Sequence, residues 1–365
     1  MSMANAQGGK ARAPGGALGR ARNDASAGGG KVRARNGASS SGGKTDARNG
    51  ASVGGASGRA RARNAGHWGK HLRRNAWLYV FLLIGLAYLI VFKYIPMAGI
   101  VIAFEDYNTF AGILGSPWVG LQNFKYLFSS AEFGRVLRNS VTLSLLRLLA
   151  GFPAPLLLAL LLNEIGSRFY KRAMQTILYL PHFVSWVVIY GILLNLLSPS
   201  TGLLNYAIAA LGGKTVSFLT SPSHFSTIVV LSDIWKNAGW GTIVYLAAIS
   251  GINPAYYEAA IIDGASRFKR IAHITLPMIA GTVVVMLILR SGSILNNGFE
   301  QIFLLQNALN ADVSEVFETY TYKVGLVEGR FPFSTAVGLF QSAVGLALIM
   351  ITNFAARKAG EGGLW

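Results

Sequence analysis

Apolar residues along the chain are gathered into long stretches that short polar segments separate. Crossing the hydrocarbon core of a bilayer takes about 20 apolar residues as a helix, and a helix satisfies its own backbone donors and acceptors where lipid offers none. Six stretches meet this requirement: Ala76–Val101, Val136–Leu162, Ala173–Leu197, Phe225–Ile249, Ile274–Leu295 and Thr335–Ala355. The pattern predicts an all-α polytopic membrane protein with six transmembrane helices.

The segment before the first stretch has a different character. Residues 1–66 are rich in Gly, Ala, Ser, Asn and Arg and show no apolar periodicity. Such a segment buries too little surface to offset the entropy of ordering it. We therefore expect a disordered Gly/Ala/Arg-rich tail over 1–66, a transmembrane domain over 67–358 and a short C-terminal tail over 359–365.

Charge is distributed unevenly along the chain. Hydrophobic residues make up 52% and charged residues 13%, and the net charge is +18. Fifteen Lys and Arg and two acids lie in residues 1–75, so that this segment alone carries +13. Basic residues beside a first span hold that end in the cytoplasm by the positive-inside rule and contact anionic headgroups. This location argues against a nucleic-acid partner.

The other loops test this orientation. Basic residues follow spans two and four and the last span, at Arg168, Lys171, Arg172, Arg267, Lys269, Arg270, Arg357 and Lys358. Acidic residues follow spans one and five, at Glu105, Asp106, Glu300, Asp312, Glu315, Glu318 and Glu328. Both patterns predict cytoplasmic N- and C-termini. The first apolar stretch starts too late and runs too long for the core of a cleavable signal.

No set of catalytic residues is evident. The chain has no cysteine, which excludes disulfides, thiolate metal sites and cysteine nucleophiles. His67 and His71 are four residues apart in a basic stretch without an acidic partner, which favours a solvated or headgroup-facing pair over a metal site. Paired carboxylates and nucleophile–base sets are missing at useful spacing. We expect a transport subunit with no catalytic or metal-binding residues and no bound cofactor, not an enzyme.

One run imitates a nucleotide-binding loop. Gly43-Lys44-Thr45 ends like a phosphate-binding loop, but the glycine required at position 38 is Ala38, and no strand precedes the run. The loop that holds phosphate needs a strand-to-helix turn with aligned backbone amides. This run is better explained by a degenerate Arg-Asn-Gly-Ala-Ser repeat, and ATP hydrolysis is expected elsewhere.

The segment between spans four and five, residues 251–277, has the signals of two short helices. Asn253 can cap a helix, Pro254 suits its first turn, and Glu258 follows near its N-terminus. Gly264 can adopt positive φ and turn the chain into a second helix from about Ala265 to His273. Pro277 then stands in the first turn of span five. The predicted shape is an L at the cytoplasmic face of the membrane.

This segment has two possible roles. An amphipathic helix could lie on the bilayer with its basic residues at the headgroups. A specific pattern favours docking instead, with matches at Glu258, Ala259, Ala260, Asp263, Gly264, Ala265, Ile274, Leu276 and Pro277. This pattern resembles the EAA motif of permease subunits in bacterial ABC importers, the maltose-importer family. Phe92–Phe104, Val119–Phe124, Gly298–Phe303, Thr319–Gly325 and Ala336–Phe340 are similar to its LplB-like carbohydrate-permease branch.

The resemblance implies a type I ABC importer permease in the bacterial inner membrane. In that family a second permease, two cytoplasmic ABC ATPase subunits that hold ATP and Mg, and a periplasmic solute-binding protein complete the machine. The nine motif residues would then form the joint with an ATPase subunit. The basic tail has no counterpart in the family pattern.

Ionisable and polar groups inside spans are costly and usually face a cavity or a partner. The candidates for a substrate pathway are Asp233, Lys236, Asn237, Trp240, Tyr245, Arg290, Asn296, Asn297 and Glu300. Asp233 and Lys236 stand at i,i+3, where they can form a structural ion pair or line the pathway. Arg290 lies near an external gate or snorkels to the interface, and the aromatic residues stack on sugars or anchor at the interface.

The cargo implied by the resemblance is a complex saccharide. Lys236 and Arg290 suit an acidic glycan such as alginate, unless Asp233 or a partner subunit neutralises them. Neutral oligosaccharides are the alternative cargo. An ATP-independent carrier would not need the segment over 251–277, and a membrane-anchored adaptor would leave the six spans unexplained.

Overall fold

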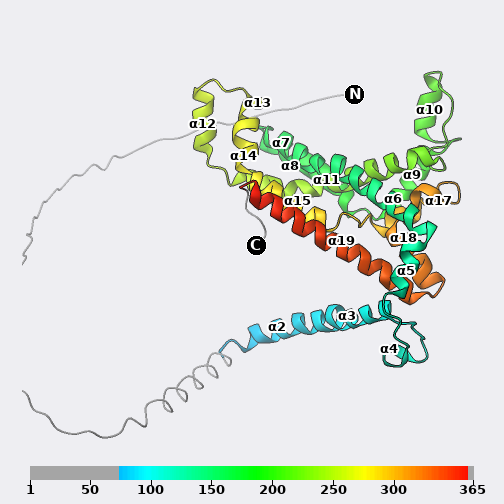
Figure 1. Cartoon of the computed structure of the whole chain (residues 1–365). Helices are drawn as coiled ribbons and strands as arrows, with labels where there is room; N and C mark the ends of the chain where they lie inside the picture. Colours follow the sequence, from blue (N-terminus) through cyan, green and yellow to red (C-terminus); the bar gives the residue numbers. More distant parts are fainter. Residues whose placement is uncertain (1–73, 361–365) are drawn as a thin grey trace, which may run out of the picture. The chain divides into compact units, whose positions relative to one another are not determined.

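A computed structural model describes residues 74–360 (Figure 1), so the predicted tail 1–66 and residues 361–365 lie outside the described residues. Within 74–360 the regular secondary structure is helical, apart from one isolated bridge between Glu105 and Trp118. The expected all-α class is confirmed.

Three helical segments are long and apolar enough to cross a membrane without a break. The first, Ala76–Phe104, joins α2 (Ala76–Leu89), a π segment η1 (Ile90–Tyr94), α3 (Ile95–Met97) and a 3₁₀ segment η2 (Ala98–Phe104). The second, Ala131–Asn163, joins α6 (Ala131–Leu146), a π segment η3 (Arg147–Gly151) and α7 (Pro153–Asn163). The third is α19 (Phe331–Lys358). These segments contain predicted spans one, two and six.

Predicted spans three and five are not continuous helices. Span three consists of α8 (Arg168–Tyr179) and a 3₁₀ turn η4 (Leu180–Phe183), followed after a 100° bend by α9 (Trp186–Leu197). Pro181 interrupts the helical ladder, and the Ser185 hydroxyl caps the new helix by accepting from Val188 N. Each bent pair can still count as one span, which allows up to five spans within 74–360.

Span five bends by 62° at Ile279. It starts with α13 (Arg267–Arg270), a π segment η5 (Ile271–Thr275) and α14 (Leu276–Met278), and continues as α15 (Ala280–Gly292). Predicted span four is the continuous helix α11 (Pro222–Ser250), which is long enough to cross at 29 residues but is not among the helices apolar enough to do so. It is less apolar than the other long helices because Ser232, Asp233, Lys236 and Asn237 interrupt it.

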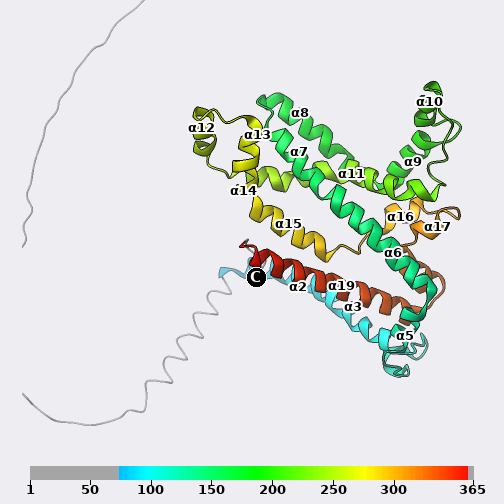
Figure 2. The ribbon, with the colours of Figure 1, turned by 45° about the horizontal axis from the view of Figure 1, so that its top comes forward.

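Shorter helices connect the long ones. They are α4 (Gly112–Gly115), α5 (Gln122–Ser129), α10 (Leu203–Ala210), α12 (Pro254–Ile262), α16 (Phe299–Leu305), α17 (Ala311–Ser314), α18 (Phe317–Tyr322) and a π segment η6 (Lys323–Val327). Figures 1 and 2 both show α12 and α13 at one end of α11 and α10 near the other.

Wide π turns carry three of the helices past a proline. Ile95, Phe152 and Leu276 each donate their N–H to the carbonyl five residues earlier, and a proline follows each directly: Pro96, Pro153 and Pro277. A proline removes one helical donor and its ring collides with the carbonyl four residues before it. The extra residue of a π turn opens the ladder at that point, so the helix continues where the sequence rule predicts an end.

Glycines permit the closest helix crossings. A Cβ added to Gly239 on α11 would lie 1.9 Å from the carbonyl oxygen of Leu178 on α8. A Cβ on Gly345 of α19 would lie 2.6 Å from the carbonyl oxygen of Gly292 on α15. Both distances are below any real carbon–oxygen contact, so only glycine fits without a shift of backbone.

The crossing at Gly239 yields a test of the packing. We expect Gly239→Ala to lower the thermal unfolding midpoint of the purified protein, because overpacking against backbone costs about 1–3 kcal/mol. Gly191→Ala on α9 is the matched control, since nothing lies within 4 Å of its added Cβ and alanine favours a helix. A drop of equal size in both variants would contradict the close crossing.

Candidate functional site

The segment over 251–277, called here the EAA loop, has the two short helices that the sequence predicts. The Asn253 side chain accepts from Ala255 N at 3.0 Å and caps α12. Gly264 has φ +73°, and Ala265 N donates back to Ala260 O at 2.8 Å, which ends α12 in a Schellman-type turn. The second helix, α13, is shorter than predicted and begins at Arg267, after a cap by Ser266. It continues through η5 into span five.

The EAA loop exposes large apolar side chains. No residue of α12 is buried. Tyr256 and Ile261 are about half exposed, and Ile262 and Phe268 are 85% and 78% exposed. Clustered exposed apolar groups in a polar loop mark a surface for a protein or membrane partner. Of the nine predicted motif residues, Glu258, Ala259, Asp263, Gly264 and Pro277 are exposed, and Ala260, Ala265, Ile274 and Leu276 are partly buried.

The loop is tied firmly to the spans on either side. The Tyr257 hydroxyl and Thr275 Oγ1 are 2.9 Å apart, which joins α12 to η5. Tyr257 and Leu276 also pack against the buried cluster formed around Tyr245, Ile249 and Ile279. The loop is therefore packed against the adjacent end of α11 and the first residues of span five.

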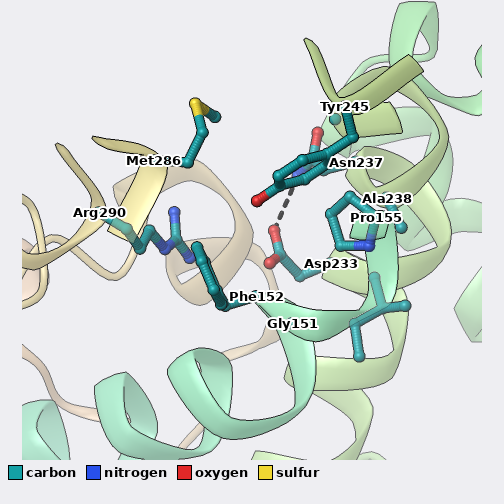
Figure 3. Close-up of a pocket in the computed structure, with 11 residues that line it drawn as sticks. Gly151, Phe152, Pro155, Asp233, Asn237, Ala238, Tyr245, Met286 and Arg290 are labelled. Carbon is teal, nitrogen blue, oxygen red and sulfur yellow. Dashed lines mark hydrogen bonds between the residues drawn. The ribbon is translucent and has the colours of Figure 1, made fainter. Parts of the chain in front are cut away.

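A cavity of about 210 Å³ lies between α7, α11 and α15 (Figure 3). Four of the nine predicted pathway residues line it: Asp233, Asn237, Tyr245 and Arg290. The view shows the Asp233 and Tyr245 oxygens on one side and the Arg290 guanidinium on the other. The other five predicted residues are not among its lining.

Asp233 is held by two neighbours. Its Oδ1 accepts from Asn237 Nδ2 at 2.8 Å and lies 3.9 Å from Arg147 Nη1. The possible pairing of Asp233 with Lys236 is therefore wrong within the described residues, because Lys236 donates instead to the carbonyls of His182 and Val184. The i,i+3 spacing allowed that pair, but Arg147 supplies the counter-charge from another helix.

Arg147 is a site residue that the sequence interpretation missed. It stands in η3, is 6% exposed, and donates to Gln301 Oε1 at 2.5 Å. Gln301 in turn donates to Val229 O and Ser232 Oγ on α11. The rule that flagged Arg290, an ionisable group inside a span, would also have found Arg147.

Arg290 differs from Arg147 in having no hydrogen-bond or ion-pair partner within residues 74–360. Its side chain is half-buried and forms no hydrogen bond or ion pair with any residue of the described part of the chain. The positive charge of Arg290 also acts on Arg147. A second cation near a single carboxylate leaves the cavity wall able to accept an anion.

The remaining candidates have structural contacts or an exposed position. Asn297 is fully buried, and its side chain donates to Ser140 O and accepts from Ser144 Oγ. The backbone N–H of Asn297 donates to Glu318 Oε1, which also accepts from Gln341 Nε2. Burial raises the pKa of Glu318. Asn296 accepts from Gly298 N, Glu300 is exposed, and Trp240 is 45% exposed with its ring stacked on His182.

Comparisons with known proteins give one consistent family. A family model described as "Binding-protein-dependent transport system inner membrane component" matches residues 151–359. Protein LplB of Bacillus subtilis (strain 168) is 48% identical over 298 residues, which cover 82% of this chain and 94% of that protein. The polygalacturonan/rhamnogalacturonan transport system permease protein YteP of the same strain is 48% identical over 294 residues, with coverage of 80% and 92%.

A solved structure is similar in fold and sequence. It is described as a bacterial alginate ABC transporter in complex with an alginate pentasaccharide-bound periplasmic protein. The matched chain has a TM-score of 0.74 and 43% sequence identity, and the match covers 81% of this chain and 99% of that chain. At this identity the likeness extends beyond the fold.

The buried charge pair behind the cavity yields a second test. We expect Asp233→Asn to lower the free energy of unfolding by about 3 kcal/mol, because it removes the carboxylate that pairs with the buried Arg147. Asp312→Asn is the control, since the exposed pair of Asp312 with Arg135 should contribute less than about 1 kcal/mol. Equal losses in denaturant titrations of the two variants would refute the buried pair.

Proposed function

This chain belongs to the family of binding-protein-dependent transport system inner membrane components and is a permease subunit of a sugar ABC importer, and we propose that its cargo is an acidic oligo- or polysaccharide. It is a membrane transport subunit and not an enzyme. The observation that carries the proposal is Arg290 on the wall of the cavity, a cation without a hydrogen-bond or ion-pair partner among residues 74–360. The names of two relatives, a polygalacturonan permease and an alginate transporter, support the same chemistry.

The cavity lining suits a uronate sugar. A guanidinium binds a carboxylate through two parallel hydrogen bonds, which gives both energy and orientation. Asp233, Asn237 and Tyr245 offer acceptors and donors for ring hydroxyls on the opposite wall. A neutral oligosaccharide would leave the Arg290 charge without a partner in a partly desolvated site.

We propose that the EAA loop docks on a cytoplasmic ATPase subunit. The loop joins the end of α11, which bears Asp233, Asn237 and Tyr245, to the start of span five, which bears Arg290. A push on the loop would therefore move both cavity walls together. Glu258 would make a charge-assisted contact, and the small side chains of Ala259, Ala260 and Gly264 would allow a close joint.

The complete importer that we propose has four further subunits of three kinds. Two ATPase subunits hold ATP and Mg, a second homologous permease completes the pathway, and a periplasmic binding protein delivers the sugar. The loops with basic residues, together with both termini, would face the cytoplasm. The chain itself would bind no cofactor.

The cargo is tested with the reconstituted complex. ATP hydrolysis is measured with binding proteins loaded with uronate glycans or with neutral oligosaccharides of equal length. We expect stimulation by the uronate series. Stimulation by neutral glycans alone would overturn the acidic cargo and leave the importer assignment standing.

The role of Arg290 gives a sharper prediction. Arg290→Gln should raise the half-maximal concentration of a uronate-loaded binding protein by about tenfold, the effect of losing one charge-assisted contact. The response to any neutral glycan that is accepted should stay unchanged. Arg138→Gln on α6, an exposed arginine, is the control. Equal shifts for acidic and neutral glycans would contradict a carboxylate contact.

The EAA loop is tested at its turn. Nothing lies within 4 Å of a Cβ added to Gly264, so Gly264→Val disturbs the positive φ and not the internal packing. We expect sugar uptake per ATP hydrolysed to fall by about tenfold in proteoliposomes, because a misdirected loop costs about 1–3 kcal/mol. Gly166→Val, in open space without positive φ, is the matched control. Unchanged sugar uptake per ATP hydrolysed, with the ATPase subunits assembled normally, would contradict the coupling role.

A further inference from the structure

The bend in span three leaves backbone carbonyls without helical partners. The 3₁₀ turn η4 ends at Phe183, α9 begins at Trp186, and the axis turns by 100° between them. The carbonyl of His182, in η4, and the carbonyl of Val184, in the gap, accept from no backbone N–H of the described residues. Orphan carbonyls at such a break need a donor from elsewhere in the protein.

Lys236 on α11 supplies that donor. Its Nζ donates to His182 O at 2.9 Å and to Val184 O as well. The side chain is 8% exposed, forms no ion pair within the described residues, and lies 5.5 Å from the ring centre of Trp186, the first residue of α9. The ammonium therefore contacts the last turn before the bend, the gap and the first residue after it.

A chain of contacts runs from this anchor to the cavity. The His182 ring nitrogen Nδ1 lies 3.1 Å from Asn237 Oδ1, and Asn237 Nδ2 donates to Asp233. Each end of the Asn237 amide thus has one contact inside the protein, so its orientation depends on the position of His182. Asn237 and Asp233 line the cavity, whereas Lys236 does not.

We propose that Lys236 is a positioning residue: it fixes the bend of span three and, through His182, orients the Asn237–Asp233 pair toward the sugar. The inference rests on the proposed function for its effect on sugar binding. It replaces the expectation that Lys236 contacts the substrate. A buried lysine held by backbone carbonyls aligns a neighbouring helix without meeting the cargo.

The bend can be measured directly in the assembled complex. The chain has no cysteine, so spin labels at Tyr170→Cys on α8 and Leu194→Cys on α9 report only this pair of helices once partner subunits lack reactive cysteines. A straight helix would separate the two backbones by about 36 Å, and a 100° bend shortens this to about 24 Å. Pulsed dipolar spectroscopy separates these distances without any sugar.

Lys236→Met should lengthen or broaden the spin-label distance and raise the half-maximal concentration of sugar-loaded binding protein by about five- to tenfold, with basal ATP hydrolysis retained. Lys236→Arg should restore both readouts, because arginine can also donate to two carbonyls. Lys214→Met, an exposed lysine before α11, is the control and should match the unmodified chain. A Lys236→Met complex with normal distance and normal sugar response overturns the proposal.

A second variant separates positioning from simple stability. His182→Phe keeps the carbonyl that Lys236 contacts but removes the ring nitrogen beside Asn237. We expect an unchanged distance and a weakened sugar response. If the His182→Phe complex responds to sugar normally, His182 does not orient Asn237 and the proposal is overturned. This result holds even if the Lys236→Met complex does not assemble. If no glycan stimulates the unmodified complex, the proposed function fails, and the distance measurement still decides whether Lys236 holds the bend.

Discussion

Every helix interruption in this chain has to satisfy its backbone polar groups from within the protein. Lipid offers no hydrogen-bond partner, so a break without an internal donor would cost several kcal/mol. The structure meets this constraint in two ways. At Pro96, Pro153 and Pro277 a wide turn passes the donor to a carbonyl one residue further back. In span three the ammonium of Lys236 reaches across from α11 to the exposed carbonyls.

This constraint also explains where charge is placed. Arg147 and Lys236 are both buried, and both serve to join segments: Arg147 links η3 to α11 and α16, and Lys236 links α11 to the bend before α9. Arg290 is the cation of this region that has no such task within the described residues. Because Arg147 and Lys236 find their partners inside the protein, α11 can carry polar residues and still pack against its neighbours.

Features set by neighbouring residues were predictable from the sequence, and features set by contacts between distant segments were not. Asn253, Pro254 and Gly264 determine the ends of α12 through neighbouring residues, so the EAA loop agrees with expectation. The six apolar stretches lie in helical segments for the same reason, although two of them are bent. Pro181 marks a break within Ala173–Leu197, but the side chain that contacts the carbonyls at the bend, Lys236, lies more than fifty residues further along and could not be foreseen from that stretch. The Asp233 partner was misjudged because spacing along one helix cannot exclude a partner from another, here Arg147.

The π turn at Arg147–Gly151 has a consequence for how lengths can vary in this part of the chain. Each residue of an α-helix adds 1.5 Å and about 100° of rotation. The extra residue in the wide turn therefore sets the rotation of α7 relative to α6, and with it the direction of Gly151, Phe152 and Pro155 at the cavity. Removing one residue there would turn that whole wall away by about a quarter of a circle. The number of residues between Arg147 and Pro153 is therefore as constrained as the identity of these two residues.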